Sequence, residues 1–261
     1  MASKELNYAL ISGAASGMGR IYAQRLAAMG YGLALVDINA EGLERLKNEL
    51  HLPGERIVCI VQDLSKSEAA ANIHAALEGR PVDILINNAG MIFTTTIPQT
   101  PPGKLNTMLM LHCNTPLLLC RMFVPEMMER GCGYILNISS ICAWMHWPAI
   151  GMYGNTKAFV KNYSRSLRIE TRGSGVSVST VCFGAVDTPL FGFSEKIRRL
   201  MLKTGIMISP EKAVDKALKA MFKRRKNLTP GFLNKMATII APLLSERCLS
   251  YLLKKFGHLL H

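Results

Sequence analysis

A tyrosine and a lysine four residues apart are the side chains with the clearest chemical potential in this sequence. Tyr153 and Lys157 lie in the run YGNTK. Because positions i and i+4 share one face of a helix, the ammonium group would lie beside the phenol and stabilise the phenolate. We therefore expect the pKa of Tyr153 to fall from about 10 towards neutrality, so that the phenol could carry protons.

Further polar side chains stand where predicted strands end. Ser139 and Ser140 close a strand just before the helix that carries Tyr153, and a hydroxyl there could hydrogen-bond a substrate oxygen. The run NNAG, residues 87–90, closes an earlier strand, where short polar side chains and a glycine would face a cofactor.

Asn114 interrupts a long, mostly apolar helical stretch. A buried amide needs hydrogen-bond partners, so one interpretation places it among the other polar groups of a site. A simple irregularity of the helix is the alternative, because Pro116 follows two residues later.

Glycines in the run SGAASGMG, residues 12–19, follow the first predicted strand and open the first predicted helix. Glycine lets the backbone turn sharply towards a pyrophosphate, and a helix start supplies free N–H groups and a partial positive charge. Asp37 ends the second predicted strand, 24 residues after Gly13. A carboxylate there can accept ribose hydroxyls and repels a 2′-phosphate, so the sequence favours NAD over NADP. Helix capping is the alternative for Asp37, but Asn39 is better placed for that role.

Apolar runs that alternate with amphipathic stretches indicate how these residues are positioned. Buried strands are predicted at Tyr8–Ser12, Gly32–Asp37, Arg56–Asp63, Asp83–Asn88, Tyr134–Ser139 and Ser177–Phe183. Helices are predicted between and after them, at Met18–Met29, Ala40–Leu50, Ser67–Leu77, Lys104–Glu129, Tyr153–Arg172 and Pro210–Lys223. This rhythm predicts an α/β fold with a Rossmann-type, doubly wound parallel sheet flanked by helices on both faces.

The composition indicates one globular domain without a metal site. The 261 residues are 49% hydrophobic and 19% charged, and the seven cysteines form no CxxC pair. The start, MASKELNYAL, lacks the apolar run of a signal peptide. The sequence contains no run of 18 apolar residues, so we expect no membrane span. We therefore expect a protein of a reducing compartment, the cytoplasm.

The charge is concentrated at one end of the chain. Residues 195–261 carry 15 Lys or Arg against 4 Asp or Glu, which leaves the first 194 residues nearly neutral. We divide the chain into a catalytic domain, residues 1–226 with a substrate loop at 188–208, and a basic extension of it, residues 227–261. Two helices are predicted in the extension, at Phe232–Leu243 and Ser245–Leu260, the second with an apolar stripe. The stripe favours docking on the domain or on a second subunit, and peripheral membrane contact is the alternative.

In combination, these motifs resemble the short-chain dehydrogenase/reductase superfamily, in its type of roughly 250 residues. The resemblance covers about residues 6–222. Its motifs are SGAASGMG at 12–19, Asp37, Asp63-Leu64, NNAG at 87–90, Asn114, NISS at 137–140, YGNTK at 153–157 and CFGAVDTP at 182–189. The resemblance implies a catalytic tetrad of Asn114, Ser140, Tyr153 and Lys157. Two departures are Ser12, where the family has Thr, and Phe183, where it has Pro.

The resemblance also implies the cofactor contacts. The adenine would meet Asp63 and Leu64, the nicotinamide carboxamide would meet Val186 and Thr188, and Asn114 would hold a water that links Lys157 to solvent. The expected cofactor-binding residues are Gly13, Ser16, Gly17, Met18, Gly19, Asp37, Asp63, Leu64, Asn88, Ala89, Gly90, Tyr153, Lys157, Gly184, Val186 and Thr188.

The implied activity is hydride transfer between NAD(H) and a secondary alcohol or ketone. Large, soft side chains near the site favour a hydrophobic substrate that is steroid-like, lipid-like or an acyl ketone. The expected pocket residues are Phe93, Cys142, Trp147, Phe183 and Phe191. Two alternatives are a sensor that binds NAD(H) without catalysis, and a membrane-surface or partner-binding protein that acts through its basic extension. We expect a homodimer or homotetramer built on the two long helices, and no nucleic-acid binding.

Overall fold

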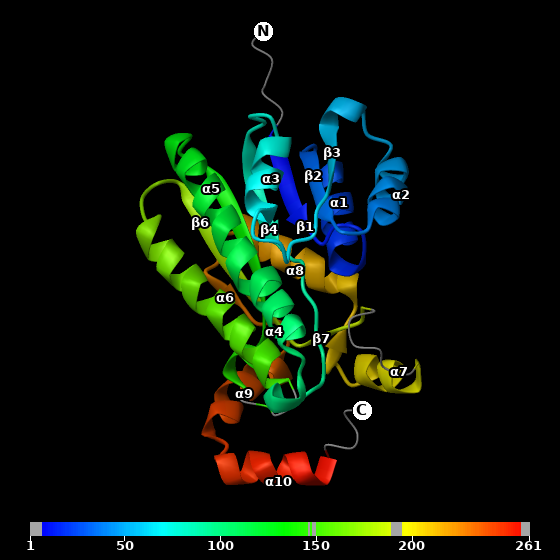
Figure 1. The fold of residues 1–261 in the computed structure, drawn as a ribbon, viewed down its shortest axis with the longest axis vertical. Helices are drawn as coiled ribbons and strands as arrows, with labels where there is room; N and C mark the ends of the chain where they lie inside the picture. Colours follow the sequence, from blue (N-terminus) through cyan, green and yellow to red (C-terminus); the bar gives the residue numbers. More distant parts are fainter. Residues whose placement is uncertain (1–6, 146, 148–149, 189–194, 257–261) are drawn as a thin grey trace.

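A parallel seven-stranded sheet forms the centre of the protein, as the computed structural model shows for residues 7–145, 147, 150–188 and 195–256 (Figure 1). Its strand order is β3-β2-β1-β4-β5-β6-β9, and every neighbouring pair is parallel. The strands are β1 (Tyr8–Ser12), β2 (Gly32–Asp37), β3 (Ile57–Val61), β4 (Val82–Asn87), β5 (Gly133–Ser140), β6 (Val176–Phe183) and β9 (Asn227–Leu228). The first six confirm the strands predicted from the sequence.

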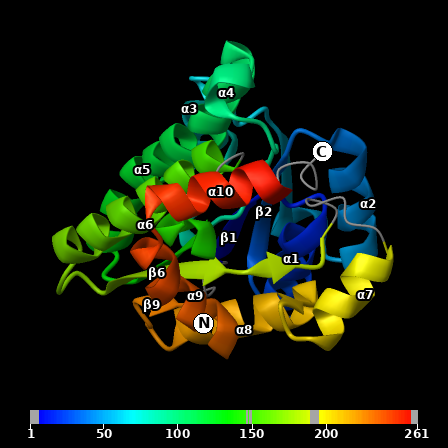
Figure 2. The ribbon, with the colours of Figure 1, turned by 90° about the horizontal axis from the view of Figure 1, so that it is seen from below.

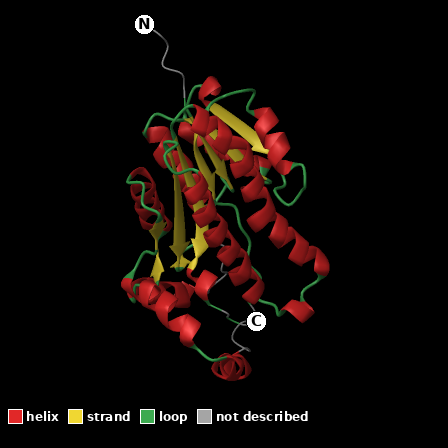
Figure 3. Cartoon of the chain, turned by 90° about the vertical axis from the view of Figure 1, so that its left-hand side faces the viewer, coloured by secondary structure: helices red, strands yellow, loops and turns green. Residues whose placement is uncertain are grey.

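Helices cover both faces of this sheet, as predicted (Figure 3). On one face lie α1 (Gly17–Ala28), α2 (Ala40–Leu50) and α8 (Pro210–Phe222), whose apolar sides join one core cluster. On the other face lie α3 (Ala69–Ala76), α5 (Thr115–Glu129) and α6 (Gly151–Glu170). Successive residues of a strand point to opposite faces. In β1, accordingly, Ala9 and Ile11 join the first cluster, while Tyr8 and Leu10 join the second.

The long helix predicted at Lys104–Glu129 is interrupted. It consists of α4 (Pro102–Leu109), a π-helical turn at Met110–Asn114, and α5. By length and composition alone, Pro102–Glu129 is the one candidate membrane span among the described residues. Half of its apolar window is buried, and Leu119, Phe123 and Met127 lie in the core. We therefore interpret it as a core helix.

The last part of the chain lies at the carboxyl end of the sheet (Figures 1 and 2). A small second sheet pairs β7 (Ala185–Val186) with β8 (Met207–Ile208). Helix α7 (Glu195–Lys203) lies in the chain segment that connects these two strands. The extension begins with β9, which pairs with β6, and continues through α9 (Phe232–Ile240) and α10 (Glu246–Phe256). Short 3-10 turns lie at Gly54–Arg56, Ile97–Gln99, Ile141–Trp144 and Ala241–Leu243.

Candidate active site

A large cavity lies where the strand order changes direction, between β1 and β4. Sheets of this kind bind ligands at that point, outside the carboxyl ends of the strands. The cavity has a volume of about 530 Å³, within the range of small-molecule sites. Most of its walls come from the turns that follow β1, β2, β3 and β4, and the rest come from α4, the π-helical turn and the segment after β7. The wall residues are Gly13, Ser16, Gly17, Met18, Asp37, Ile38, Gln62, Asp63, Leu64, Ser65, Asn88, Ala89, Gly90, Thr107, Leu111 and Thr188.

The glycine-rich turn after β1 has no room for larger side chains. A Cβ on Gly19 would lie 1.9 Å from the carbonyl oxygen of Gly13. A Cβ on Gly13 would lie 2.9 Å from Ala89 Cα, and Gly13 has a φ of 68°, which disfavours other residues. Helix α1 therefore starts close against the sheet, with its first residues lining the cavity. This start can hold an anion through free N–H groups.

Ser12 joins this turn to the turn after β4. Its hydroxyl oxygen accepts hydrogen bonds from the backbone N–H groups of Asn88 (3.0 Å) and Ala89 (3.1 Å). The Asn88 side chain returns a hydrogen bond to the Ser12 carbonyl oxygen at 3.0 Å. The hydroxyl that Ser12 shares with the family's usual Thr therefore has a structural role, and the substitution preserves it.

Asp37 reaches across from β2 to the glycine-rich turn. Its two carboxylate oxygens accept hydrogen bonds from the backbone N–H groups of Ala15 and Asn39, both at 3.0 Å. Asn39 caps α2 by accepting from Gly42 N at 2.9 Å, so Asp37 is not the helix cap. The carboxylate is held in a fixed orientation on the wall of the large cavity.

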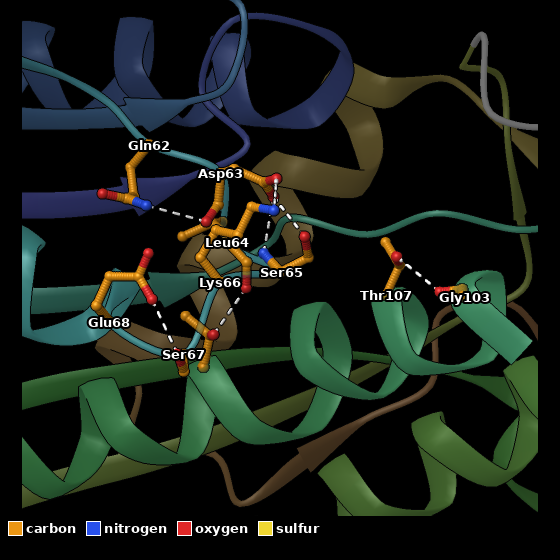
Figure 4. A network of polar contacts seen from close by, with 10 residues as sticks. Gln62, Asp63, Leu64, Ser65, Lys66, Ser67, Glu68, Gly103 and Thr107 are labelled. Carbon is orange, nitrogen blue, oxygen red and sulfur yellow. Dashed lines mark hydrogen bonds and ion pairs between the residues drawn. The ribbon is translucent and has the colours of Figure 1, made fainter.

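The turn after β3 is held by its own hydrogen bonds (Figure 4). Asp63 Oδ1 accepts from the hydroxyl of Ser65 at 2.7 Å and from its backbone N–H at 2.9 Å. Both bonds lower the pKa of Asp63, so its carboxylate is ionised at neutral pH. Gln62, Ser65 and Thr107 also line the cavity. No sequence motif marks these three residues, because only the fold brings them together.

A second, smaller cavity of about 70 Å³ holds the residues with catalytic potential. Tyr153, Lys157 and Ser140 all line it, and it shares Met18, Asn88, Gly90 and Thr188 with the large cavity. The remaining walls are Met91, Ile138, Ser139, Phe183, Gly184 and Val186. The structure thus brings the expected cofactor-binding residues other than Gly19, and the expected catalytic residues other than Asn114, to one continuous site. Gly19 lies behind the glycine-rich turn, packed against Gly13.

Two backbone-anchored contacts fix the lysine beside the tyrosine. Lys157 Nζ donates to the Ile138 carbonyl oxygen at 3.0 Å, and the Ser139 hydroxyl donates to the Lys157 carbonyl oxygen at 2.7 Å. The same Nζ lies 5.6 Å from the centre of the Tyr153 ring. Strand β5 therefore determines where α6 presents its catalytic face.

The expected fall in the pKa of Tyr153 is not what this environment produces. Burial raises the pKa of Tyr153, and the neighbouring Cys142 raises it further, while a hydrogen bond with Ser140 lowers it. Lys157 lies over the ring and donates to Ile138, so its charge does not offset the burial. A raised pKa keeps the phenol protonated at neutral pH, which suits a proton donor.

Lys157 should make the stability of the protein depend on pH. Burial lowers the pKa of Lys157 to about 8, against about 10.4 in an unfolded chain. Between these two values the unfolded chain binds a proton that the folded chain does not, so the free energy of unfolding rises with pH. We expect wild type to gain roughly 2 to 3 kcal/mol between pH 7.5 and 10 relative to Lys157→Met, measured by urea unfolding.

Comparing the free energies of unfolding of wild type and Lys157→Met cancels the pH effects of groups that both proteins contain. Burial raises the pKa of Cys182 to about 11, which makes stability fall as pH rises through the alkaline range, but this thiol is present in both proteins. A difference that stays constant with pH would show that Lys157 titrates normally.

The imidazole of His112 lies beside this pair. A Cβ on Gly90 would lie 3.2 Å from His112 Nε2 and 3.6 Å from Lys157 Nζ, and the His112 and Tyr153 rings are 5.8 Å apart. Asn114 lies two residues further along the π-helical turn, which is about half a turn of such a helix. Asn114 lines neither cavity, so its expected role, holding a water beside Lys157, stays a prediction.

The expected substrate-binding residues have different outcomes. Phe183 is buried and lines the small cavity. Phe93, Cys142 and Trp147 are half-buried and do not belong to the walls of either cavity, so their role stays a prediction. Phe191 lies outside the described residues. Sequence reasoning missed that the extension contacts the wall of the small cavity. Asn234 of α9 lies against Gly184, in the space that a Cβ of Gly184 would need.

Comparison with known proteins places this geometry in context. A family model described as short chain dehydrogenase matches residues 7–198. The 17-beta-hydroxysteroid dehydrogenase type 3 of Danio rerio is 30% identical over 192 residues, which cover 71% of this chain and 62% of the relative. The very-long-chain 3-oxoacyl-CoA reductase of Pyricularia oryzae is 31% identical over 184 residues, which cover 68% of this chain and 56% of the relative. The match thus spans about three fifths of each relative's length.

Solved structures share the fold over almost their whole length. A short-chain dehydrogenase from Sphingobium yanoikuyae, in complex with NADPH, has a TM-score of 0.76 at 27% identity, covering 92% of this chain and 97% of that one. The 3-ketoacyl-(acyl-carrier-protein) reductase from Brucella melitensis, complexed with NADH, has a TM-score of 0.76 at 28% identity, covering 87% and 98%. They confirm the predicted Rossmann-type fold.

Proposed function

This chain is a member of the short-chain dehydrogenase/reductase family, and we propose that it uses NAD(H) to interconvert a secondary alcohol and a ketone, with Tyr153 as general acid and base. One observation carries the proposal. Tyr153, Lys157 and Ser140 line a small cavity that shares walls with the cavity at the switch point. A site of this shape can hold a dinucleotide in the large part and a small reacting group in the small part.

The residues of the large cavity fit a dinucleotide. A Cβ on Gly13 would clash with Ala89 and a Cβ on Gly19 would clash with Gly13, so only glycine at these positions allows this tight turn beside the cavity. The start of α1 offers an anion site, and the fixed carboxylate of Asp37 faces the same cavity. Gly184, Val186 and Thr188 would hold the nicotinamide end beside Tyr153. When bound, the nicotinamide supplies or accepts the hydride.

The protein's own groups would handle the proton. Ser140 and Tyr153 would hydrogen-bond the substrate oxygen from one wall of the small cavity. In reduction the phenol of Tyr153 gives its proton to that oxygen, and the product is an alcohol. In oxidation the proton passes from the alcohol to the phenolate. The Lys157 ammonium, 5.6 Å from the ring centre, would reduce the cost of the buried phenolate without removing it.

We propose a hydrophobic substrate: a steroid-like, lipid-like or acyl ketone. The small cavity is lined by Met18, Met91, Ile138 and Phe183 beside its polar groups. Such walls suit the apolar carbons next to a reacting carbonyl, while the rest of the substrate would lie outside this small cavity. Two of the relatives are named for a hydroxysteroid and a very-long-chain 3-oxoacyl substrate, which supports this substrate class.

The direct test is a substrate screen followed by NADH absorbance. Steroid ketones and 3-oxoacyl thioesters should be reduced with higher kcat/KM than acetone, because burial of the apolar body adds binding free energy. Binding of NADH without turnover of any ketone or alcohol in the screen would favour the sensor alternative.

We also propose that the extension binds anionic membrane surfaces. Large apolar side chains on α9, α10 and the turn between them are exposed, and Phe232 and Leu243 are 76% and 78% exposed. Lys235, Arg247 and Lys254 are exposed on the same segment. Apolar and basic side chains together are typical of helices that lie on anionic lipid. Figure 1 shows α10 at the end of the molecule beyond α9, at the carboxyl end of the sheet.

Vesicle flotation should detect this binding. We expect wild type to float with vesicles of phosphatidylcholine and phosphatidylserine at low salt, and with phosphatidylcholine alone much less. The double variant Phe232→Ser/Leu243→Ser should lose at least about tenfold in partitioning, since burial of the two side chains contributes several kcal/mol. Ile169→Ser is the matched control, because Ile169 is 69% exposed on α6 outside the extension.

Absence of flotation would contradict the membrane proposal. If the double variant instead changed the mass of the protein in light scattering, the apolar surface would belong to a contact between two copies of the chain. The expected homodimer or homotetramer and the cytoplasmic location stay predictions. Exposed Leu117 on α5 and Phe159 on α6 support contacts of these helices with a second copy.

A further inference from the structure

We propose that His112 is a positioning residue, which holds the cofactor-binding run Asn88–Gly90 at a fixed distance from the helix that carries Tyr153. This inference rests on the proposed function. His112 Nε2 lies 2.9 Å from the backbone nitrogen of Met91, the residue after that run. On the other side of the ring, Nδ1 lies 2.9 Å from Thr156 Oγ1 on α6.

The hydrogen bonds determine which nitrogen carries the proton. A backbone N–H can only donate, so Nε2 accepts from Met91 and carries no hydrogen. The Thr156 hydroxyl donates to the Tyr153 carbonyl oxygen at 2.8 Å, so it accepts from Nδ1–H. His112 is therefore a neutral imidazole with both nitrogens occupied. It has no free group with which to relay a proton.

The surroundings keep the imidazole neutral. His112 is almost completely buried, and burial lowers its pKa well below the usual value. The ammonium of Lys157 lowers the pKa further. A positively charged ring would also lose the bond from Met91 N–H, because Nε2 would then carry a hydrogen.

The π-helical turn makes this contact possible. His112 lies within Met110–Asn114, where backbone hydrogen bonds span five residues instead of the four of an α-helix. The ring thus reaches inward between the loop after β4 and the first turns of α6, with Gly90 close beside it. Two elements that carry expected cofactor-binding or catalytic residues, the loop after β4 and α6, therefore meet at this side chain. A displacement of about 1 Å between such groups can cost about 100-fold in rate.

Two substitutions separate the two bonds of the ring. His112→Asn keeps an amide near the Nδ1 position and can serve Thr156, whereas His112→Gln places its amide near the Nε2 position and can serve Met91. If His112 holds both sides, each variant should lose about 10-fold to 100-fold in kcat with a bulky ketone. The KM for the ketone should change less than about threefold, because the substrate walls are untouched.

Thr156 provides an independent test of the same contact. Thr156→Val removes the hydroxyl and should lower kcat to a similar degree, while Thr156→Ser keeps the hydroxyl and should stay near wild type. The double variant His112→Gln/Thr156→Val should be no slower than the slower single variant, since both break one chain of bonds. His74→Asn is the control, because His74 pairs with Glu126 away from the site.

Rates should be expressed per NADH-binding site, so that loss of folded protein is not counted as loss of catalysis. Wild-type kcat per site in either His112 variant would overturn the inference, because each variant lacks one of the two contacts. These results are distinct from failure of the proposed function itself. That failure would appear as unchanged turnover when Tyr153 is replaced.

Discussion

Tyr153→Phe should lower kcat with a hydrophobic ketone by at least about 10³-fold, with NADH affinity within about threefold of wild type. The variant loses only the hydroxyl, and general acid–base catalysis by a side chain contributes about 10² to 10⁴-fold. The hydroxyl also holds the substrate oxygen, so its loss affects both proton transfer and orientation. Turnover would be measured by NADH absorbance and affinity by NADH fluorescence.

Tyr22→Phe is the control for this substitution. Tyr22 is a fully buried tyrosine of α1 in the core, and its loss of a hydroxyl should leave kcat unchanged. Turnover that persists in Tyr153→Phe would remove Tyr153 from the mechanism. If wild type binds NADH but turns over nothing, the fold carries a sensor, because function resides in the site and not in the fold.

Periodicity was sufficient to predict the sheet and most of its covering helices. Strands β1 to β6 are apolar runs between helical patterns. Parallel strands that helices cover on both faces have this apolar composition. Strand β9 was missed because Asn227–Leu228 contains only two residues, too few for a pattern. A helix irregularity at Asn114 was one of two interpretations of the sequence, and the structure shows a π-helical turn that ends at this residue.

The site was predictable where one local segment carries the chemistry. Tyr153 and Lys157 share a helix, and the glycines of residues 12–19 share a turn, so spacing alone brought them together. His112 could not be found in this way, because its importance comes from contacts with Met91 and Thr156, 21 and 44 residues away. Nor could spacing show that burial would outweigh the charge of Lys157 at Tyr153.

Asp37→Asn should shift the cofactor preference towards NADPH by about 100-fold in the ratio of the two kcat/KM values. Wild type should prefer NADH, because a fixed carboxylate on the wall of the large cavity repels the 2′-phosphate of NADPH. A 100-fold change corresponds to about 3 kcal/mol, the size expected for two close charges near a protein surface. Asparagine keeps the shape of the side chain and one acceptor oxygen.

Repulsion between charges near a protein surface weakens as the salt concentration rises. The preference of wild type for NADH should therefore decrease as salt rises, while that of Asp37→Asn should not. Asp63→Asn is the matched control, because the Asp63 carboxylate is engaged by Ser65 and its loss should weaken both cofactors alike. Higher kcat/KM with NADPH than with NADH in wild type would contradict the expected repulsion of the 2′-phosphate by Asp37. The prediction from the sequence would then be wrong.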